Sequence, residues 1–440
     1  MQSDMDAFDV IVVGTGPGGA TVAREMSLRN RRVLMLEWGD QDPVTGTLSQ
    51  YLTRASLPGK GLMITNNLLG MLRGITTGGS SVFYYATAIE PPMEMLAKYG
   101  IDIKDQVDEI RRELPLEPLA PHLIGPMANR IMASARELGY EWHPLPKFIY
   151  QDRCQPNCWR CNYGCPFGAK WNARVFVNEA IDHGARLVTK AKARRVLVKN
   201  NRAVGVEYVR SGTVHKVRAP VVVVAAGGVG SPMILRSSGI AAAGHDWFFD
   251  PLMMVMGTVD DMDGGREHPM AAGLRMADEG YVMTDMTVPG TLHRVFNAQI
   301  FRFDKLFSHA RTLAIMIKIK DSLGGRLTAR GGVRKKLVPS DMEKFHRGFA
   351  RARGILENAG ARSVWKSWYI AAHPGGTVKV GDLLDSDLKT EIDNLYVCDC
   401  SVIPEAWGLP PAFTLLALGK RLAGHLSNES SKPAMIPSAF

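Results

Sequence analysis

The chain has 440 residues, 46% of them hydrophobic, with six cysteines and a formal net charge of +10. A chain of this length is expected to bury a large core in two or three domains, and no stretch approaches the roughly 20 apolar residues of a membrane span. Its basic clusters, at residues 190–195 and 330–336, lack interleaved aromatic residues, which argues against nucleic-acid binding. The acidic segment 1–8 does not have the features of a secretory signal, so the sequence predicts a cytoplasmic protein.

The first predicted unit is a strand, a glycine-rich turn and a helix, in the stretch DVIVVGTGPGGA that starts at Asp9. Gly14 permits a tight turn, Gly16 lets the backbone approach a pyrophosphate, and Gly19 lets the helix pack on the strand. The next predicted strand ends in Glu37, about 20 residues further on, where a carboxylate would accept the ribose hydroxyls and repel a 2′-phosphate. The pattern predicts a dinucleotide site, and the alternative is a tight turn without function.

The elements that follow alternate between helices and short strands. Residues 73–85 carry too many small residues for a packed helix and are expected to form a loop against a ligand. Helices are predicted at residues 105–114, 126–138, 174–183 and 227–240. Residues 186–224 are predicted to form a series of small strands, followed by a buried strand of the main sheet.

Residues 245–365 differ in composition, since they are rich in Met, Phe and Arg, and they are expected to cover the active site as a second domain. A strand is predicted at residues 312–320, and a helix at residues 341–358 with Ser340 as its cap. Residues 394–426 return to a strand, a Pro/Gly-rich turn and an apolar helix that complete the nucleotide-binding sheet. The tail from residue 428 to residue 440 is expected to be flexible.

Four of the six cysteines lie within twelve residues: Cys154, Cys158, Cys161 and Cys165, with the spacing C-x3-C-x2-C-x3-C-P. Such short gaps wrap the backbone around a compact object, as an iron-sulfur cluster requires. One alternative is a zinc site formed by the same cysteines. Another is that the cysteines are structural, either reduced or disulfide-bonded. The first three cysteines also match radical enzymes that use S-adenosylmethionine, although that chemistry requires a barrel.

The other two cysteines, Cys398 and Cys400, lie two residues apart on a predicted strand. Residues with this spacing share one face of a strand, and free cysteine packs as a small apolar side chain. Both are therefore expected to lie in the core.

Taken together, four blocks of sequence resemble the glucose-methanol-choline (GMC) oxidoreductase family. These blocks are GTGPGG, then RGITTGGSS at residues 73–81, GVGSPMILRSSGI at residues 228–240, and HPGGTVKVG at residues 373–381 followed by NLYVCDCSVIP and FTLLALGKRLAGHL. The resemblance implies an α/β fold, with a Rossmann-like FAD-binding domain and a second, smaller substrate domain built on a β-sheet.

The resemblance also divides the chain and assigns the cofactor contacts. It implies FAD-binding parts at residues 1–90, 176–244 and 366–427, a helical substrate-side segment at 91–150, a cysteine segment at 151–175, and a substrate domain at 245–365. The residues implied to hold FAD are Gly14, Gly16, Gly19 and Glu37 at the adenosine end, Gly78, Gly79 and Ser80 along the flavin and pyrophosphate, Asp399 near the ribityl chain, and Pro411.

The resemblance places the catalytic histidine of the family at His373, where it would take the hydroxyl proton of an alcohol. The family usually has a second His or Asn that binds the same oxygen, but the corresponding residue here is Pro410, which has no side-chain donor. Glu405, Tyr369 and Trp407 are the nearest candidates in sequence for this contact. Alternatively, Glu405 is a solvated turn residue, or the substrate is not a simple alcohol.

The cysteine segment further resembles the iron-sulfur-bearing catalytic subunits of FAD-dependent glucose and sugar-alcohol dehydrogenases. This implies a dehydrogenase that oxidises a CH-OH group and relays electrons through a cluster, 4Fe-4S in preference to 3Fe-4S, to a protein acceptor or partner subunit. An apolar or aromatic alcohol is favoured over a sugar by a set of apolar residues, which could also be plain core: Met270, Met276, Met283, Met286, Phe301, Trp368 and Trp407.

Three alternatives to this function stay open. The first is an oxidase of the same family that uses dioxygen, with zinc or nothing at the cysteines. The second is an electron-transfer flavoprotein without substrate chemistry, which the proline at position 410 makes worth testing. The third is the reverse flux, in which a carbonyl or an alkene is reduced.

Overall fold

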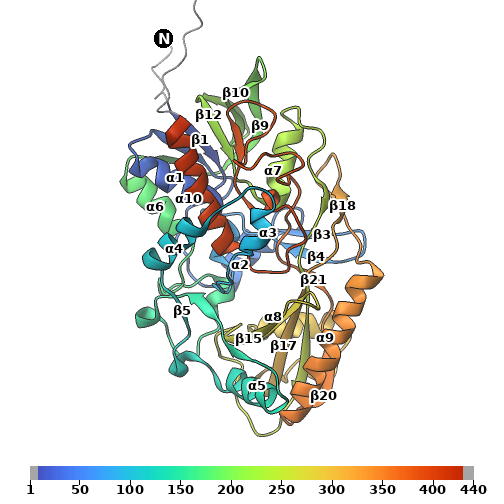
Figure 1. Ribbon diagram of the computed structural model, residues 1–440. Coiled ribbons are helices and arrows are strands. Elements are labelled where there is room, and N and C mark those ends of the chain that lie inside the picture. Colours follow the sequence, from blue (N-terminus) through green and yellow to red (C-terminus); the bar gives the residue numbers. More distant parts are fainter. Residues whose placement is uncertain (1–7, 430–440) are drawn as a thin grey trace, which may run out of the picture.

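The computed structural model describes residues 8–429, which form two lobes around two large sheets (Figure 1). Residues 1–7 and 430–440 lie outside the described part, and with them most of the acidic start and of the predicted tail. None of the helices in residues 8–429 is long and apolar enough to cross a membrane.

The first lobe is built on a five-stranded parallel sheet, in the order β22-β12-β1-β2-β8. Its strands are β1 (Val10–Val13), β2 (Val33–Leu36), β8 (Arg186–Val188), β12 (Val221–Val224) and β22 (Leu395–Val397). β1 is buried along its whole length, because a central parallel strand is covered on both faces, and this explains its unbroken run of apolar residues.

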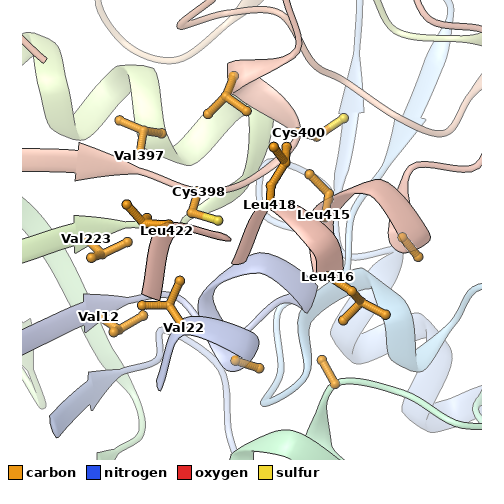
Figure 2. Packing of buried hydrophobic residues seen from close by; sticks show 14 of the residues in the cluster. Val12, Val22, Val223, Val397, Cys398, Cys400, Leu415, Leu416, Leu418 and Leu422 are labelled. Atoms are coloured by element: carbon orange, nitrogen blue, oxygen red, sulfur yellow. The ribbon is translucent and has the colours of Figure 1, made fainter. Parts of the chain in front are cut away.

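Helices pack against this sheet and against one another (Figure 1). α1 (Pro17–Leu28) contacts both α6 (Arg174–Asp182) and the C-terminal helix α10 (Ala412–Glu429). Figure 2 shows Val12, Val22 and Val223 in one apolar layer with Leu416 and Leu422 of α10. The first strand and the last helix of the chain therefore belong to the same core.

Cys398 and Cys400 are both buried, which confirms that they are core residues (Figure 2). They do not share a strand, because β22 ends at Val397 and Cys400 begins the 3-10 helix η7 (Cys400–Val402). The reason is Asp399, which accepts a hydrogen bond from the N–H of Ser401 and turns the chain out of the sheet.

The predicted series of small strands after residue 186 is confirmed. β9 (Ala191–Lys199), β10 (Arg202–Arg210) and β11 (Thr213–Arg218) form a separate antiparallel sheet, and the chain then enters β12 of the main sheet. Four predicted helices are also confirmed, as α4 (Lys104–Glu113), α5 (Pro126–Glu137), α6 and α7 (Gly227–Arg236).

The second lobe is built on a nine-stranded sheet in the order β3-β4-β21-β14-β17-β16-β15-β6, with β20 also paired to β14. Its strands are β3 (Leu62–Ile64), β4 (Gly70–Leu72), β6 (His143–Pro144), β14 (Pro251–Thr258), β15 (Ala272–Met276), β16 (Tyr281–Asp285), β17 (Thr312–Ile319), β20 (Arg362–Lys366) and β21 (Ile370–Ala371). α9 (Pro339–Asn358) lies along this sheet, and α5 packs against α9 (Figure 1).

The expected strand at residues 312–320 is β17, but the start of the long helix was predicted incorrectly. α9 begins at Pro339, with Val338 as its N-cap, so Ser340 lies inside the first turn and does not cap it. Proline at the first helical position has a favourable φ and needs no N–H partner there. The Asp341 carboxylate accepts a hydrogen bond from the N–H of Val338 (3.2 Å) and so completes the start of the helix.

The remaining elements are short. They are α2 (Leu48–Ala55), α3 (Met93–Ala97), α8 (Gly290–Gln299), β5 (Leu116–Pro118), β7 (Pro146–Phe148), β13 (His245–Trp247), β18 (Gly324–Leu327) and β19 (Val333–Arg334), with the 3-10 helices η1 (Gly79–Val82), η2 (Pro121–Leu123), η3 (Gln151–Arg153), η4 (Arg160–Tyr163), η5 (Phe303–Lys305) and η6 (His309–Arg311).

Candidate flavin and substrate site

A cavity of about 1480 Å³ extends from the glycine turn after β1 to the nine-stranded sheet of the second lobe. Its walls include the turn at Gly16, Gly79 of η1, Gly227 at the start of α7, Lys318 of β17 and His373. Sites for drug-sized ligands occupy roughly 300–1,000 Å³, so this space is large enough for a dinucleotide together with a small substrate.

The glycines of the turn have distinct structural roles. Gly14 has φ +97°, and a Cβ added to it would lie 2.3 Å from the carbonyl oxygen of Ala225. A Cβ on Gly19 would lie 2.3 Å from the carbonyl oxygen of Gly14, whereas a Cβ on Gly16 would meet nothing within 4 Å. Gly14 and Gly19 are therefore required by the fold, while Gly16 leaves space at the cavity wall for a ligand.

The same turn offers unpaired N–H groups. α1 starts at Pro17 with Gly16 as its N-cap, and no side chain caps the helix. The first N–H groups of a helix have no partner within the helix and attract an anion, so the pyrophosphate of FAD fits this position.

Glu37 lies at the end of β2, buried in the cavity wall. Its carboxylate accepts hydrogen bonds from the Thr15 hydroxyl (2.6 Å), the Thr15 N–H (3.2 Å) and the Gly39 N–H (2.7 Å). Burial raises the pKa of Glu37, and these hydrogen bonds oppose that shift. Since each carboxylate oxygen can accept more than one bond, the group can still receive a ribose hydroxyl.

The loop at residues 73–85 lies against the glycine turn, while its expected contact with a ligand stays a prediction. The N–H of Gly78 donates to the Thr15 hydroxyl (3.1 Å), and a Cβ on Gly79 would lie 3.1 Å from the Cα of Gly16. Gly79 and Ser80 line the cavity, and the Ser80 hydroxyl accepts a hydrogen bond from the N–H of Gly74 (2.9 Å).

Asp399 and Pro411 approach the cavity from the C-terminal part of the chain. Asp399 is buried, and one of its oxygens accepts hydrogen bonds from the Gly227 N–H (2.8 Å) and the Ser231 hydroxyl. Burial raises the pKa of Asp399, and hydrogen bonds oppose this shift. Pro410 and Pro411 both line the cavity, so the structure brings Asp399 and the two prolines to one wall.

The register of the large sheet brings three charged or titratable residues to the other end of the cavity. Pro251 pairs with Ala371, so Asp250 and His373 lie at the neighbouring ends of β14 and β21. On the other side of β14, Leu252 pairs with Lys318 of β17. The His373 Nδ1 is 2.8 Å from the Lys318 Nζ and 3.2 Å from the Asp250 Oδ2.

His373 is neutral near pH 7 in this setting. Burial and the positive charge of Lys318 lower its pKa to about 4, and the neighbouring Asp250 carboxylate opposes both. The side chain keeps 25% of its surface exposed, and the residue lines the cavity. Because the Nδ1 contacts Lys318 and Asp250, the Nε2 is the ring nitrogen left for a substrate.

Sequence motifs do not single out Lys318 and Asp250. A lysine in the apolar strand TLAIMIKI was a usable signal, since an ammonium group buried in a strand needs a charged or polar partner. Asp250 carried no such signal, because its partners come from distant segments. Its Oδ1 accepts from the Gly408 N–H (2.8 Å), and its own N–H donates to Asp321 (2.9 Å).

The structure does not bring Glu405 and Tyr369 to His373. Glu405 accepts a hydrogen bond from the Tyr99 hydroxyl (3.4 Å), and Tyr369 packs on Phe345 with ring centroids 4.8 Å apart. Neither belongs to the cavity lining found within residues 8–429, and the same is true of the buried Trp407. Both polar candidates are close to the motif residues in sequence, whereas β-sheet pairing decides which residues lie near His373.

The cavity lining that the second lobe contributes is mostly apolar, and it contains only part of the predicted set of apolar residues. Met270 and Met286 line the cavity, Met283 is buried in the second core, and Phe301 and Trp368 are 80% and 44% exposed. Further apolar residues of this lining include Leu252, Met254, Val282, Val288, Leu292, Phe296 and Met316.

The cysteine segment does not form a metal-binding site in the described structure. Cys161 is buried, Cys154, Cys158 and Cys165 are half-buried, and all are free thiols. Within the part of the chain that the structure describes, no group of three or more His, Cys, Asp or Glu side chains could hold a metal ion. Burial raises the pKa of Cys154 to about 12, helped by the neighbouring cysteines. The four thiols as placed do not by themselves form a metal site, and no electron-transfer step is assigned to them.

A parallel sheet that presents a glycine turn to one end of a cavity, with a neutral histidine at the other end, defines a dinucleotide-dependent oxidoreductase. The GMC oxidoreductase family model matches residues 8–255 with its N-terminal part and residues 332–419 with its C-terminal part. The chain therefore belongs to the GMC oxidoreductase family, and it is an FAD-dependent enzyme that acts on CH-OH groups. The family match does not distinguish an iron-sulfur subtype, which stays a prediction.

Known relatives cover most of the chain. It is 25% identical to an uncharacterised GMC-type oxidoreductase of Mycobacterium tuberculosis, over 94% of this chain and 75% of the relative. An uncharacterised protein of Methanocaldococcus jannaschii is 26% identical, over 94% of this chain and 98% of the relative. A long-chain-alcohol oxidase of Arabidopsis thaliana is 22% identical, over 93% of this chain and 66% of the relative.

Solved structures share the fold. Pyridoxine 4-oxidase from Mesorbium loti superimposes with a TM-score of 0.73 at 17% identity, over 96% of this chain and 99% of that chain. A variant of formate oxidase from Aspergillus oryzae gives a TM-score of 0.76 at 16% identity, over 97% of this chain and 99% of that chain. The expected α/β fold with a Rossmann-type FAD domain is thus confirmed.

Proposed function

We propose that this enzyme oxidises an apolar or aromatic alcohol to the corresponding carbonyl compound, with His373 as the group that accepts the hydroxyl proton. The observation that carries the proposal is the neutral His373 at the apolar end of the cavity, with its Nε2 left for a ligand. A neutral imidazole can accept a proton. An apolar wall favours an apolar substrate, because moving such a substrate out of water costs little free energy.

Residues at one end of the cavity would bind the cofactor, and residues at the other end would bind the substrate. Gly16, the start of α1 and Glu37 would hold the pyrophosphate and the ribose, and bound FAD supplies a hydride acceptor. The wall formed by Met254, Met316 and their apolar neighbours would orient the substrate and exclude water, which strengthens electrostatic interactions at His373.

The test is reduction of the FAD-loaded enzyme by candidate alcohols without oxygen. We expect benzyl alcohol and 1-octanol to bleach the flavin absorbance, and glucose and sorbitol to do so far more slowly, because their hydroxyls would lose hydrogen bonds to water in an apolar wall. Faster bleaching by the sugars would contradict the proposed substrate class. If none of these compounds reduces the flavin, the electron-transfer flavoprotein without substrate chemistry becomes the better hypothesis.

An iron-sulfur relay to a protein acceptor is the second candidate, and the cysteine spacing supports it. One feature of the structure also favours an anionic group there. The buried Lys170 Nζ donates to the carbonyl oxygens of Val82, Tyr84 and Cys161, so its hydrogen bonds involve no carboxylate. A buried positive charge is costly without a counter-charge, and a thiolate-bound cluster would provide one.

Metal analysis of protein purified without oxygen decides between the two electron acceptors. If the cysteines hold a cluster, we expect to find iron and acid-labile sulfide in the wild-type protein. Both should be lost in Cys161→Ser, because all four thiolates are needed to hold the cluster. The matched control is Cys398→Ser, since Cys398 is a buried core cysteine outside the segment. Iron-free wild-type protein whose reduced flavin is reoxidised rapidly by dioxygen would instead establish an oxidase.

A further inference from the structure

Lys318 is a buried cation placed directly against the imidazole of His373. Its side chain is 2% exposed, and β17 holds it between Leu252 of β14 and Val282 of β16, both of which line the cavity. Its Nζ lies 2.8 Å from the His373 Nδ1 and 3.1 Å from the Asp250 Oδ2. The charge of Lys318 is thus shared between a carboxylate and one ring nitrogen.

This contact decides where the hydrogen of the imidazole lies. An ammonium group has three donors and no acceptor, so at 2.8 Å it can bond the Nδ1 only through the lone pair of that nitrogen. A neutral imidazole carries one hydrogen, which must then be on the Nε2. Without the ammonium, the Nδ1 could carry the hydrogen and donate it to Asp250, which is 3.2 Å away.

We propose that Lys318 is a positioning residue that selects the tautomer of His373 and so controls whether this histidine donates to, or accepts from, the substrate oxygen. The inference rests on the proposed alcohol oxidation. With Lys318 as the ammonium, the Nε2–H donates to the substrate oxygen, a contact for which Pro410 has no side-chain donor. When Lys318 has lost a proton, the Nδ1–H donates to Asp250 and the Nε2 is free to act as base.

The chemical step then balances in the base form. The hydroxyl proton of the alcohol would pass to the Nε2 of His373, and bound FAD would accept the carbon-bound hydrogen as a hydride. One O–H and one C–H bond break while the C=O bond forms, so two electrons reach the flavin and one proton remains on the imidazole.

The surroundings of Lys318 favour loss of a proton from its ammonium group. Its charged and titratable neighbours are Asp250, Asp321, Cys400 and His373, and Asp321 is itself paired with Lys335 at 2.9 Å. Burial lowers the pKa of Lys318, and the charge of Asp250 opposes that shift. Since raising the pH removes the proton, the base form of His373 increases with pH, and the rate of oxidation should increase with it.

Nitrogen NMR of selectively ¹⁵N-histidine-labelled protein reads the tautomer directly, because a protonated and an unprotonated ring nitrogen have distinct shifts. The His373 signal is assigned by its loss in His373→Gln. We expect the hydrogen on the Nε2 in the wild type near pH 7, and on the Nδ1 in Lys318→Met. The same tautomer in both proteins would overturn the proposal.

Lys335→Met is the matched control, since it removes a second buried lysine from a second buried aspartate without touching His373. It should keep the wild-type tautomer. Should Lys318→Met fail to fold, titration of the wild type from pH 6 to pH 10 provides the same test. There, His373 must change from the Nε2–H to the Nδ1–H form as the pH rises, and an unchanged tautomer contradicts the proposal.

A pH profile of anaerobic flavin reduction by benzyl alcohol gives the second readout. Between pH 7 and pH 9 the wild-type rate should rise with pH, whereas Lys318→Met should lose this rise and be at least ~10-fold faster than the wild type at pH 7, because no proton has to leave Lys318 before the Nε2 of His373 can act as base. Lys335→Met should keep the rise. A profile of Lys318→Met that still rises like the wild type would contradict the proposal.

The two readouts separate two kinds of failure. Flavin that no alcohol reduces, in a protein whose tautomer changes as expected, refutes the proposed function and leaves the role of Lys318 at the imidazole standing. Flavin that alcohol reduces, in a protein whose tautomer does not respond to Lys318, refutes only this inference.

Discussion

Replacement of His373 by glutamine is expected to slow anaerobic reduction of bound FAD by an alcohol by about 10²- to 10⁴-fold, the usual contribution of a general base. Glutamine keeps hydrogen-bonding groups but cannot accept a proton near neutral pH. The bound FAD should be retained, because the residues proposed to hold it lie at the other end of the cavity. Stopped-flow absorbance with benzyl alcohol measures the effect.

Glu405→Gln is the matched control for this experiment. Glu405 was a sequence-based candidate for the second contact to the substrate, but it bonds Tyr99 and does not line the cavity. Its replacement should therefore leave the rate of flavin reduction close to that of the wild type. A small effect of His373→Gln together with a large effect of Glu405→Gln would show that the catalytic assignment is wrong.

Replacement of Gly16 by alanine is expected to remove FAD without unfolding the protein. A Cβ at position 16 meets nothing within 4 Å of the chain itself, so the fold can accept it. The methyl group would occupy the space in which the pyrophosphate must approach the backbone. Overpacking by one methyl costs about 1–3 kcal/mol, which weakens FAD binding by roughly 5- to 150-fold. The ratio of flavin to protein absorbance and a thermal melt measure the two quantities.

Replacements of two other glycines serve as comparisons for Gly16→Ala. Gly354→Ala makes the same chemical change inside α9, where a Cβ also meets open space, and should keep FAD while stabilising the protein by about 0.5–1 kcal/mol. Gly14→Ala combines φ +97° with an approach of 2.3 Å to Ala225, so it should destabilise the fold itself. A Gly16→Ala protein with normal FAD content would refute the assigned position of the pyrophosphate.

Much of the first lobe was predictable because local patterns there coincide with the final structure. The buried run of β1, the glycine turn and α1 follow one another directly in sequence, so a single short motif specifies their arrangement. The same holds for the helices α4 to α7, whose apolar spacing and boundaries can be read locally. The start of α9 is the exception, since Pro339 and Asp341 together displaced the expected cap at Ser340.

The end of the cavity at His373 depends on contacts between distant segments. Asp250, Lys318 and His373 come from three strands or strand ends, and only the pairings of β14 with β17 and β21 bring them together. Sequence distance led to Glu405 and Tyr369, which the sheet leaves outside the cavity lining of the described chain. The cysteine segment shows the opposite case, since a compact spacing predicts a cluster that the placement of the thiols does not by itself provide.

The sequence by itself determined the nucleotide-binding turn, the family and the position of the histidine, because each depends on residues that are close neighbours in the chain. Only the tertiary structure decided which charges surround that histidine. The physical reason is that hydrogen-bonded strand pairing, and not distance along the chain, sets which side chains share a buried space, and burial in turn sets their proton affinities.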